Sequence, residues 1–197
     1  MKTMKTKLFF SLAALLIATS LNAQNQNPRW GVELNGGVSF ATSNLAEASL
    51  NTGGGFEFNF QYRVMEHTGL YAGWGWNKFS ADHSFAGENA DFEETGYVFG
   101  LQFKHPLGTT PLSYYARLGG LYNHIEVENN PGDIIHDTGH GFGFQLAAGV
   151  DIPLGKNWSL TPGVKFNSIN RELKEVETVE HMNLNYVQLR VGIVKTF

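Results

Sequence analysis

Cysteine is absent from this 197-residue chain, and charged side chains are scarce. Without cysteine the chain can form no disulfide framework, no Cys-ligated metal site and no thiol nucleophile. No apolar run reaches the roughly 18 residues that a transmembrane helix needs. Only 16% of the residues are charged, against roughly 25% in ordinary soluble domains. The formal net charge of -4 argues against a nucleic-acid partner.

Glycine and aromatic residues are abundant instead, with 23 glycines and 13% aromatics. This combination favours many short strands, and the length favours a single domain. The N-terminal segment is set apart from the rest. Lysines precede an apolar stretch over residues 8–21, and the small residue Ala23 follows it, as in a secretory signal. A membrane anchor is the alternative, but the stretch is too short for a hydrocarbon core of roughly 30 Å. We expect cleavage after Ala23, so that residues 1–23 are a signal peptide and residues 24–197 form the exported domain.

The exported part alternates apolar and polar residues with the period of two that strands show. Phe56, Phe58 and Phe60, for example, alternate with Glu57 and Asn59. The same pattern predicts eight strands, over residues 30–40, 53–64, 70–77, 96–104, 112–122, 141–152, 158–167 and 187–197. Pro162 interrupts one of them, because proline has no donor for the ladder.

Short and long connections take turns between these strands. The short ones lie at 65–68, 106–111 and 153–157, and the long ones at 41–52, 80–92, 126–139 and 171–182. Strands of about ten residues, with short turns on one side and long loops on the other, are typical of outer-membrane barrels.

The polar face of the strands favours a membrane barrel over the other candidate, a soluble barrel of the lipocalin type. A soluble barrel would carry many Lys and Glu residues on its outer face, whereas here Gly, Asn, Gln and Ser dominate the polar face. Its few charged residues can pair with one another inside a narrow barrel. We predict an interior ion-pair network that contains Glu33, Glu57, Asp151, Arg63, Lys104, Arg117, Lys165 and Arg190.

The apolar face carries no charge between its aromatic ends, as lipid contact requires, because Arg or Lys at the midplane costs about 2–4 kcal/mol. Lys78 and Lys195 share this face near strand ends, where they can snorkel. The aromatic side chains predict two interfacial belts, Trp30, Tyr62, Tyr114 and Trp158 at the short-turn end and Trp76, Tyr97 and Tyr122 at the long-loop end. Because lipid offers no partner to an open sheet edge, the first strand must pair with the last. The predicted fold is all-β, an eight-stranded antiparallel up-and-down transmembrane β-barrel.

These strands resemble the OmpA- and OmpW-like family of eight-stranded outer-membrane β-barrels over residues 29–197. Val191, Ile193 and the terminal Phe197 are similar to the family's assembly signal, although Lys195 stands where an apolar or aromatic residue is usual. The resemblance implies a monomer in the bacterial outer membrane, among lipid and lipopolysaccharide. It also implies the barrel-assembly machinery as a partner.

Acidic residues gather in the four long connections or directly beside them, where 14 of the 18 lie: Glu47, Asp82, Glu88, Asp91, Glu93, Glu94, Glu126, Glu128, Asp133, Asp137, Glu172, Glu175, Glu177 and Glu180. Such loops could bind divalent cations or bridge through them to lipopolysaccharide phosphates. They could instead form a solvated, repulsive rim, which is the favoured interpretation because no loop has the spacing of a calcium motif. His136, Asp137 and His140 could ligate a metal, but a polar loop is the favoured interpretation. We therefore expect no metal and no cofactor.

Two activities compete with a structural role. His83 and Ser84 with Glu88 or Asp91 come nearest to the set of the lipid A deacylases, which are barrels of this size. Consecutive residues of an extended segment point to opposite sides, so we expect no catalytic residue and no enzyme.

Transport is the second alternative. An eight-stranded barrel holds side chains rather than an aqueous channel. A small-solute route of the OmpW type stays open, with Tyr115 and Leu121 on the interior face as its support. We favour a plugged barrel with a structural or surface-interaction role, exerted through long, mobile acidic loops outside the cell.

Overall fold

The computed structural model describes residues 28–46, 48–174 and 179–197, so the predicted signal peptide, residues 1–23, lies outside the described residues. The strands are β1 (Trp30–Ala41), β2 (Gly53–Arg63), β3 (Thr68–Ser84), β4 (Gly87–Pro106), β5 (Ser113–Glu128), β6 (Ile134–Asp137), β7 (Gly141–Gly155), β8 (Trp158–Lys174) and β9 (Val179–Thr196). None of the described residues belongs to a helix that is long and apolar enough to cross a membrane.

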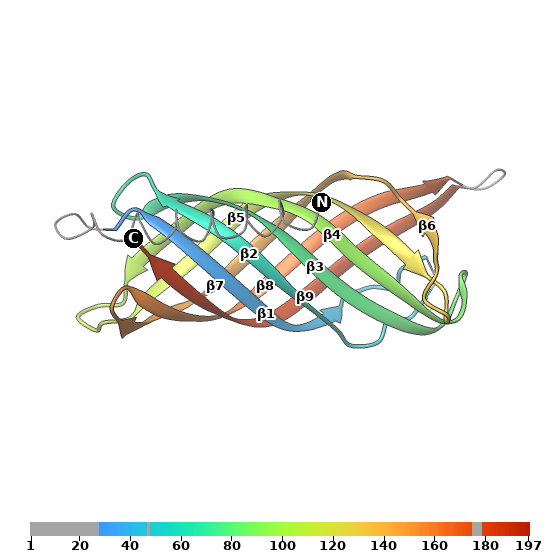
Figure 1. Ribbon diagram of the computed structural model, residues 1–197, viewed down its shortest axis with the longest axis horizontal. Helices are drawn as coiled ribbons and strands as arrows, with labels where there is room; N and C mark the ends of the chain where they lie inside the picture. Colours follow the sequence, from blue (N-terminus) through green and yellow to red (C-terminus); the bar gives the residue numbers. More distant parts are fainter. Residues whose placement is uncertain (1–27, 47, 175–178) are drawn as a thin grey trace, which may run out of the picture.

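Eight of these strands close into an antiparallel ring, in which each strand runs obliquely to the long axis (Figure 1). The order around the ring is β1, β2, β3, β4, β5, β7, β8 and β9, and β4 pairs with β5 to complete it. β9 pairs back to β1 from Gly31 opposite Thr196 to Ala41 opposite Tyr186. The predicted eight-stranded barrel and its pairing of first strand with last are therefore confirmed. β6 lies outside the ring, against the end of β5.

The short-turn end holds the start of β1 and the C-terminus, which are tied together by the Phe197 N–H donating to the Trp30 carbonyl at 2.8 Å. Lys156 and Asn157 connect β7 to β8 with φ angles of 51° and 62°, as a tight two-residue hairpin turn requires. Pro162 stays within β8. The pairing of β8 with β7 is interrupted at Pro162. The pairing of β8 with β9 continues there, with Pro162 opposite Val191.

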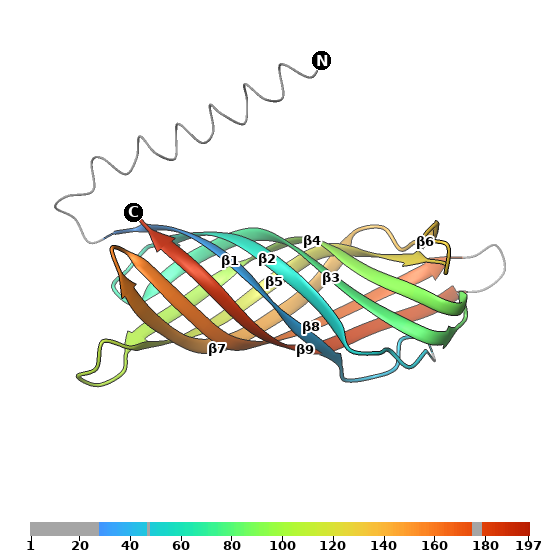
Figure 2. The ribbon, with the colours of Figure 1, turned by 60° about the horizontal axis from the view of Figure 1, so that its bottom comes forward.

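Three of the four expected long loops are replaced, in whole or in part, by continuations of the strands among the described residues. β3 and β4 extend until Ser84 lies opposite Gly87, so that two residues form the turn where a loop over 80–92 was expected. The described residues of the segments 126–139 and 171–182 likewise add to β5, β8 and β9 and contribute β6. Figure 2 shows the β3–β4 hairpin and the paired ends of β8 and β9 at the end opposite the C-terminus. The prediction of long acidic loops is wrong for these segments, because most of their described acids lie on strands.

The sense of the alternation reverses along the strands, and this explains the extensions. In the part of the barrel nearer the short-turn end, called the lower part, outward side chains are apolar and exposed. The exposed fraction is 59% for Leu118 and 58% for Leu189. Towards the long-loop end, outward residues become polar and inward residues become apolar, because the solvent outside the barrel changes from hydrocarbon to water. The inward apolar residues form a core with the loop residues Leu45 and Ala48: Tyr71, Phe79, Ala81, Ala90, Phe92, Val98, Leu121, Ile125, Val127, Ile169, Leu173, Met182, Leu184 and Tyr186.

Candidate functional site

The lower interior of the barrel is built around a buried ion pair between β1 and β5. An Arg117 Nη1 atom lies 2.6 Å from a carboxylate oxygen of Glu33, and both side chains are almost fully buried. Gln61 and Thr161 each donate to Glu33 at 3.0 Å. These donors satisfy the carboxylate where water has little access, as a buried charge requires.

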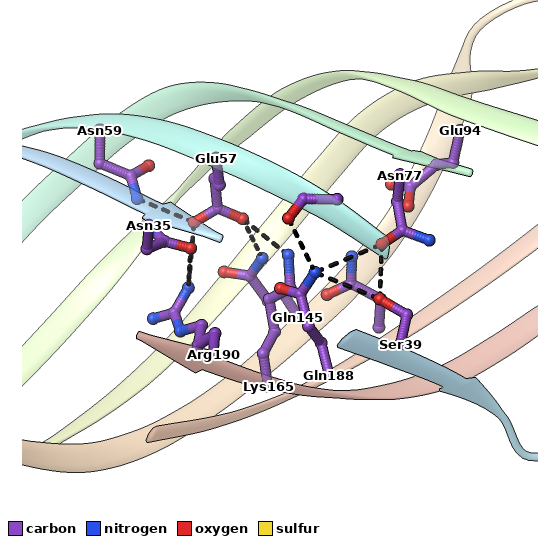
Figure 3. Close-up of polar contacts among 12 residues, drawn as sticks. Asn35, Ser39, Glu57, Asn59, Asn77, Glu94, Gln145, Lys165, Gln188 and Arg190 are labelled. Atoms are coloured by element: carbon purple, nitrogen blue, oxygen red, sulfur yellow. Dashed lines mark hydrogen bonds and ion pairs between the residues drawn. The ribbon is translucent and has the colours of Figure 1, made fainter. Parts of the chain in front are cut away.

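Glu57 on β2 forms the centre of the interior (Figure 3). Lys165 on β8 and Arg190 on β9 lie 3.1 Å and 3.4 Å from its carboxylate oxygens. Gln145 and Asn59 each donate to the same carboxylate at 2.8 Å. One acidic side chain thus connects β2 to three other strands across the barrel.

The remaining predicted network residues lie apart, near the short-turn end. Lys104 and Asp151 form a separate pair at 2.7 Å. Arg63 and Lys104 line a cavity of about 360 Å³ that opens at this end of the barrel. Gln61 and Gln102 also line it, and they bond to Glu33 and Arg117 respectively, so the network forms the floor of the cavity. The structure therefore brings five of the eight predicted residues together in the centre.

A second layer of polar side chains lies between Glu57 and the long-loop end of the barrel. The sequence pattern did not identify this layer. Gln188 donates to Ser39 at 3.2 Å, and Ser39 donates to Asn77 at 2.6 Å (Figure 3). Glu94, which was expected in a loop, points inward and accepts from the Tyr186 hydroxyl at 2.5 Å.

Arg171 is a further interior residue that was expected in a loop. It is buried, and its guanidinium donates to the backbone carbonyls of Asn123, Gly141 and Phe142. It therefore joins β8 to β5 and β7. Its inward position follows from parity, because Ile169 and Leu173 on the same strand face the apolar core.

Tyr115 and Leu121, the proposed support for a solute route, fill space instead of lining a passage. Leu121 is 3% exposed and belongs to the apolar core. Tyr115 lies where glycine leaves room for it, since a Cβ at Gly149 or Gly163 would lie 2.6 Å or 2.4 Å from its hydroxyl. The enclosed space beside Glu57, Glu94 and Tyr186 measures about 10 Å³, room for roughly one water molecule.

The predicted belt aromatics lie at the two ends of the outward apolar band. Trp30 and Tyr62 contact each other at the short-turn end, with ring centroids 4.5 Å apart. Trp158 lies under the Lys195 ammonium, 5.2 Å from the ring centroid. The other members are outward on their strands, with Tyr114 near the short turns and Trp76, Tyr97 and Tyr122 where the alternation reverses.

A charge cluster lies just beyond the upper belt, on the water-facing part of the outer face. The Lys78 ammonium contacts the carboxylates of Asp91, Glu93 and Glu128 at 2.8–2.9 Å. Trp76 Nε1 also donates to Glu93 at 2.8 Å. Partial burial opposes ionisation of Glu93, but the donors Lys78 and Trp76 outweigh it and hold the pKa of Glu93 below its ordinary value of 4.5.

A second cluster joins β5 to β6 on the outer face. His124 Nδ1 lies 2.9 Å from Asp137 and 3.9 Å from Glu126, and the His140 ring stacks on His124 with centroids 4.4 Å apart. Of the three residues considered as metal ligands from the sequence, Asp137 and His140 lie here. His136 instead contacts the Phe85 ring. Partial burial of Asp137 is outweighed by hydrogen bonds from His124 and the Gly139 N–H, so the pKa of Asp137 is lowered.

Comparison with known proteins identifies the family to which this barrel belongs. A family model described as the outer membrane protein beta-barrel domain matches residues 11–197. The chain belongs to this family. It is therefore a protein of the bacterial outer membrane, surrounded by membrane lipid. A comparison with curated proteins found no significant match.

Solved structures of other outer-membrane barrels share the fold of this family member at low sequence identity. Neisserial surface protein A (NspA) has a TM-score of 0.62 at 18% identity, over 85% of this chain and 97% of that one. OprG from Pseudomonas aeruginosa has a TM-score of 0.54 at 15% identity, over 87% and 97%. Outer membrane protein W from E. coli has a TM-score of 0.55 at 13% identity, over 88% and 100%.

The residues considered for lipid A deacylation are arranged as a hairpin tip in this outer-membrane barrel. His83 lies opposite Glu88, and Ser84 lies opposite Gly87. The Ser84 hydroxyl donates to the Gly87 carbonyl at 3.2 Å and accepts from the Ala86 N–H at 3.1 Å. Its contacts are thus those of a turn residue.

Proposed function

We propose that this outer-membrane barrel is non-conducting and non-enzymatic, and that it has a structural or surface-interaction role. The observation that supports this most is the filling of the interior by side chains from the floor of the cavity at the short-turn end to the long-loop end. The ion pairs around Glu33 and Glu57 fill the part within the membrane, and the apolar core that includes Leu45 fills the part beyond it. A sealed interior leaves the outer surface as the place where this protein can act.

The strand extensions supply the surface for such a role. Their outward residues include the exposed acids Asp82, Glu88 and Glu172, while their inward residues form the core. An extension with its own core holds its outer face in a defined shape, as a loop without such a core does not. This favours interaction through a structured, acidic surface over interaction through mobile loops.

Lipid contact, export and assembly complete the proposal. Residues 1–23 would be removed as a signal peptide, and the barrel-assembly machinery would insert residues 24–197. Val191 and Ile193 of the proposed assembly signal face outward, and Phe197 pairs with Trp30. A closed ladder presents no open edge to a second copy, which supports a monomer. Lipopolysaccharide would surround the upper belt.

Electrical recording in planar lipid bilayers tests the sealed interior against a small-solute channel. We expect the inserted full barrel to give no single-channel current steps, because the narrow interior holds side chains and has no aqueous path. Insertion is checked by recovering the protein and showing that it migrates differently on a detergent gel before and after boiling. Reproducible current steps from protein verified in this way would contradict the proposal and favour the channel.

A further inference from the structure

The cluster of His124, Glu126 and Asp137 has the composition and spacing of a metal site. Among the described residues it is the one group of three or more His, Asp or Glu side chains whose ligand atoms all lie within 4.8 Å of one another. Tetrahedral Zn²⁺ with bonds of about 2.0–2.2 Å separates its ligand atoms by about 3.3–3.6 Å. The distances from His124 Nδ1 to Asp137 and Glu126, 2.9 Å and 3.9 Å, lie on either side of that range.

The backbone holds these side chains in place. Glu126 on β5 lies directly opposite Asp137 on β6, and His124 lies two residues before Glu126 on the same outward face. Next to them, the Thr138 N–H donates to the Ile125 carbonyl at 3.1 Å, and the Ile125 N–H donates to the Thr138 hydroxyl at 2.9 Å. Three potential ligands are therefore presented from two paired strands.

His140 borders the cluster. Its ring stacks on that of His124 with an interplanar angle of 18°. His140 and Asp137 also line an open cavity of about 500 Å³ against β8, through which an ion and its waters can enter. The imidazole of His124 and the carboxylates of Glu126 and Asp137 form a donor set that suits borderline divalent ions such as Zn²⁺, with water in the remaining position.

The neighbouring charges distinguish this cluster from an ordinary surface ion pair. Asp91, Glu93 and Glu128 converge on the Lys78 ammonium, whereas Glu126 and Asp137 face imidazoles. We propose that His124, Glu126 and Asp137, with water completing the coordination, bind a divalent transition-metal ion of the Zn²⁺ class on the outer surface. The ion would join β6 to β5 and so fix the segment that follows β5. This site is independent of the sealed interior, so either proposal can fail without the other.

Competition for Zn²⁺ against a chromophoric chelator tests the site on the full barrel in detergent micelles. We expect one saturable Zn²⁺ per barrel. His124→Gln and Asp137→Asn should each weaken binding at least about tenfold, because each removes a direct ligand where even a supporting contact is worth about 10- to 100-fold. Replacing Zn²⁺ by Co²⁺ should produce visible d–d absorption bands that both variants lose.

The opposite end of the barrel offers a matched control. The His67 ring contacts the His105 ring in a tilted arrangement with centroids 4.5 Å apart, and Glu66 lies 3.9 Å from His67, so this group contains two imidazoles but one carboxylate. His67→Gln should leave Zn²⁺ affinity unchanged. All variants must keep the gel shift on boiling that marks a folded barrel. Absence of saturable binding in the unaltered chain, or equal losses in His67→Gln and His124→Gln, would overturn the proposal.

Discussion

Glu57 shows how a single residue connects the barrel across its interior. It is 2% exposed, and its contacts reach Lys165, Arg190 and Gln145 on three other strands. Two cationic groups share this one carboxylate. Removing its charge would therefore leave two buried positive charges with reduced compensation, and such a loss is strongly destabilising.

We expect Glu57→Gln to lower the free energy of unfolding by about 3–5 kcal/mol, the usual cost of breaking a buried pair from one side. Denaturant unfolding in lipid or detergent, followed by tryptophan fluorescence, measures it. Glu66→Gln is the control, because the Glu66 side chain is 87% exposed and such surface changes stay within about 0.5 kcal/mol. Equal midpoints for the two variants would show that the Glu57 contacts contribute little.

Single residues also show what parity can and cannot predict. The alternation places Glu33, Glu57 and Arg117 on the inner face, where the structure has them. It does not determine which charges meet, because that depends on how the strands are staggered around the ring. Arg171 shows the limit, since it was assigned to a loop once the sense of the alternation had changed.

At the scale of elements, the β3–β4 hairpin passes from lipid into water. Trp76 lies in the upper belt, and Lys78, two residues further along, contacts Glu93 on the opposite strand. The pKa of Glu93 is lowered in the folded state, so its pairing with Lys78 stabilises the hairpin above pH 4.5. That stability is lost as the pH falls through the folded pKa.

The Trp76 indole N–H should report this titration in NMR spectra, because it donates to Glu93. We expect its resonance to shift with a midpoint below pH 4.5. In Lys78→Met the midpoint should rise, since the largest of the interactions that lower the pKa is removed. The Trp74 indole, two residues earlier on the same strand, is the internal control and should not follow the titration. A Trp76 midpoint that is the same in both proteins would contradict the assigned ion pair.

The extensions could in part have been predicted from the sequence. Phe79 and Ala81 on β3, and Phe92 on β4, continue the period of two beyond the belt, with the apolar side now facing inward. Strands that are identified by their outward apolar residues end at the belt, although the alternation with a period of two continues beyond it. The His124 cluster is different, because it depends on β6 pairing with β5 through a register shift near Glu128. Nothing in the local period encodes that pairing.

At the scale of the whole molecule, the barrel depends on one pairing between distant parts of the sequence. β1 and β9 join the two ends of the chain, with Leu34 opposite Ile193 on the lipid-facing side. Every other neighbouring pair in the ring is nearer in sequence. Because lipid provides no hydrogen-bond partners, an unclosed ladder would leave backbone groups unsatisfied at a cost of several kcal/mol each.

The absence of cysteine makes this closure directly testable. Leu34→Cys together with Ile193→Cys should form a disulfide on mild oxidation, since side chains directly opposite have Cβ atoms about 4.5–5.5 Å apart. Leu34→Cys with Leu189→Cys is the matched control, because a four-residue offset adds roughly 13 Å along the strand and exceeds the reach of a disulfide. On a boiled, unreduced detergent gel, the first pair should migrate as a cross-linked loop that reductant converts to the linear chain. Efficient cross-linking of the offset pair, or none of the opposed pair, would mean that the ring closes in a different register and that the interior contacts assigned across β1 and β9 are incorrect.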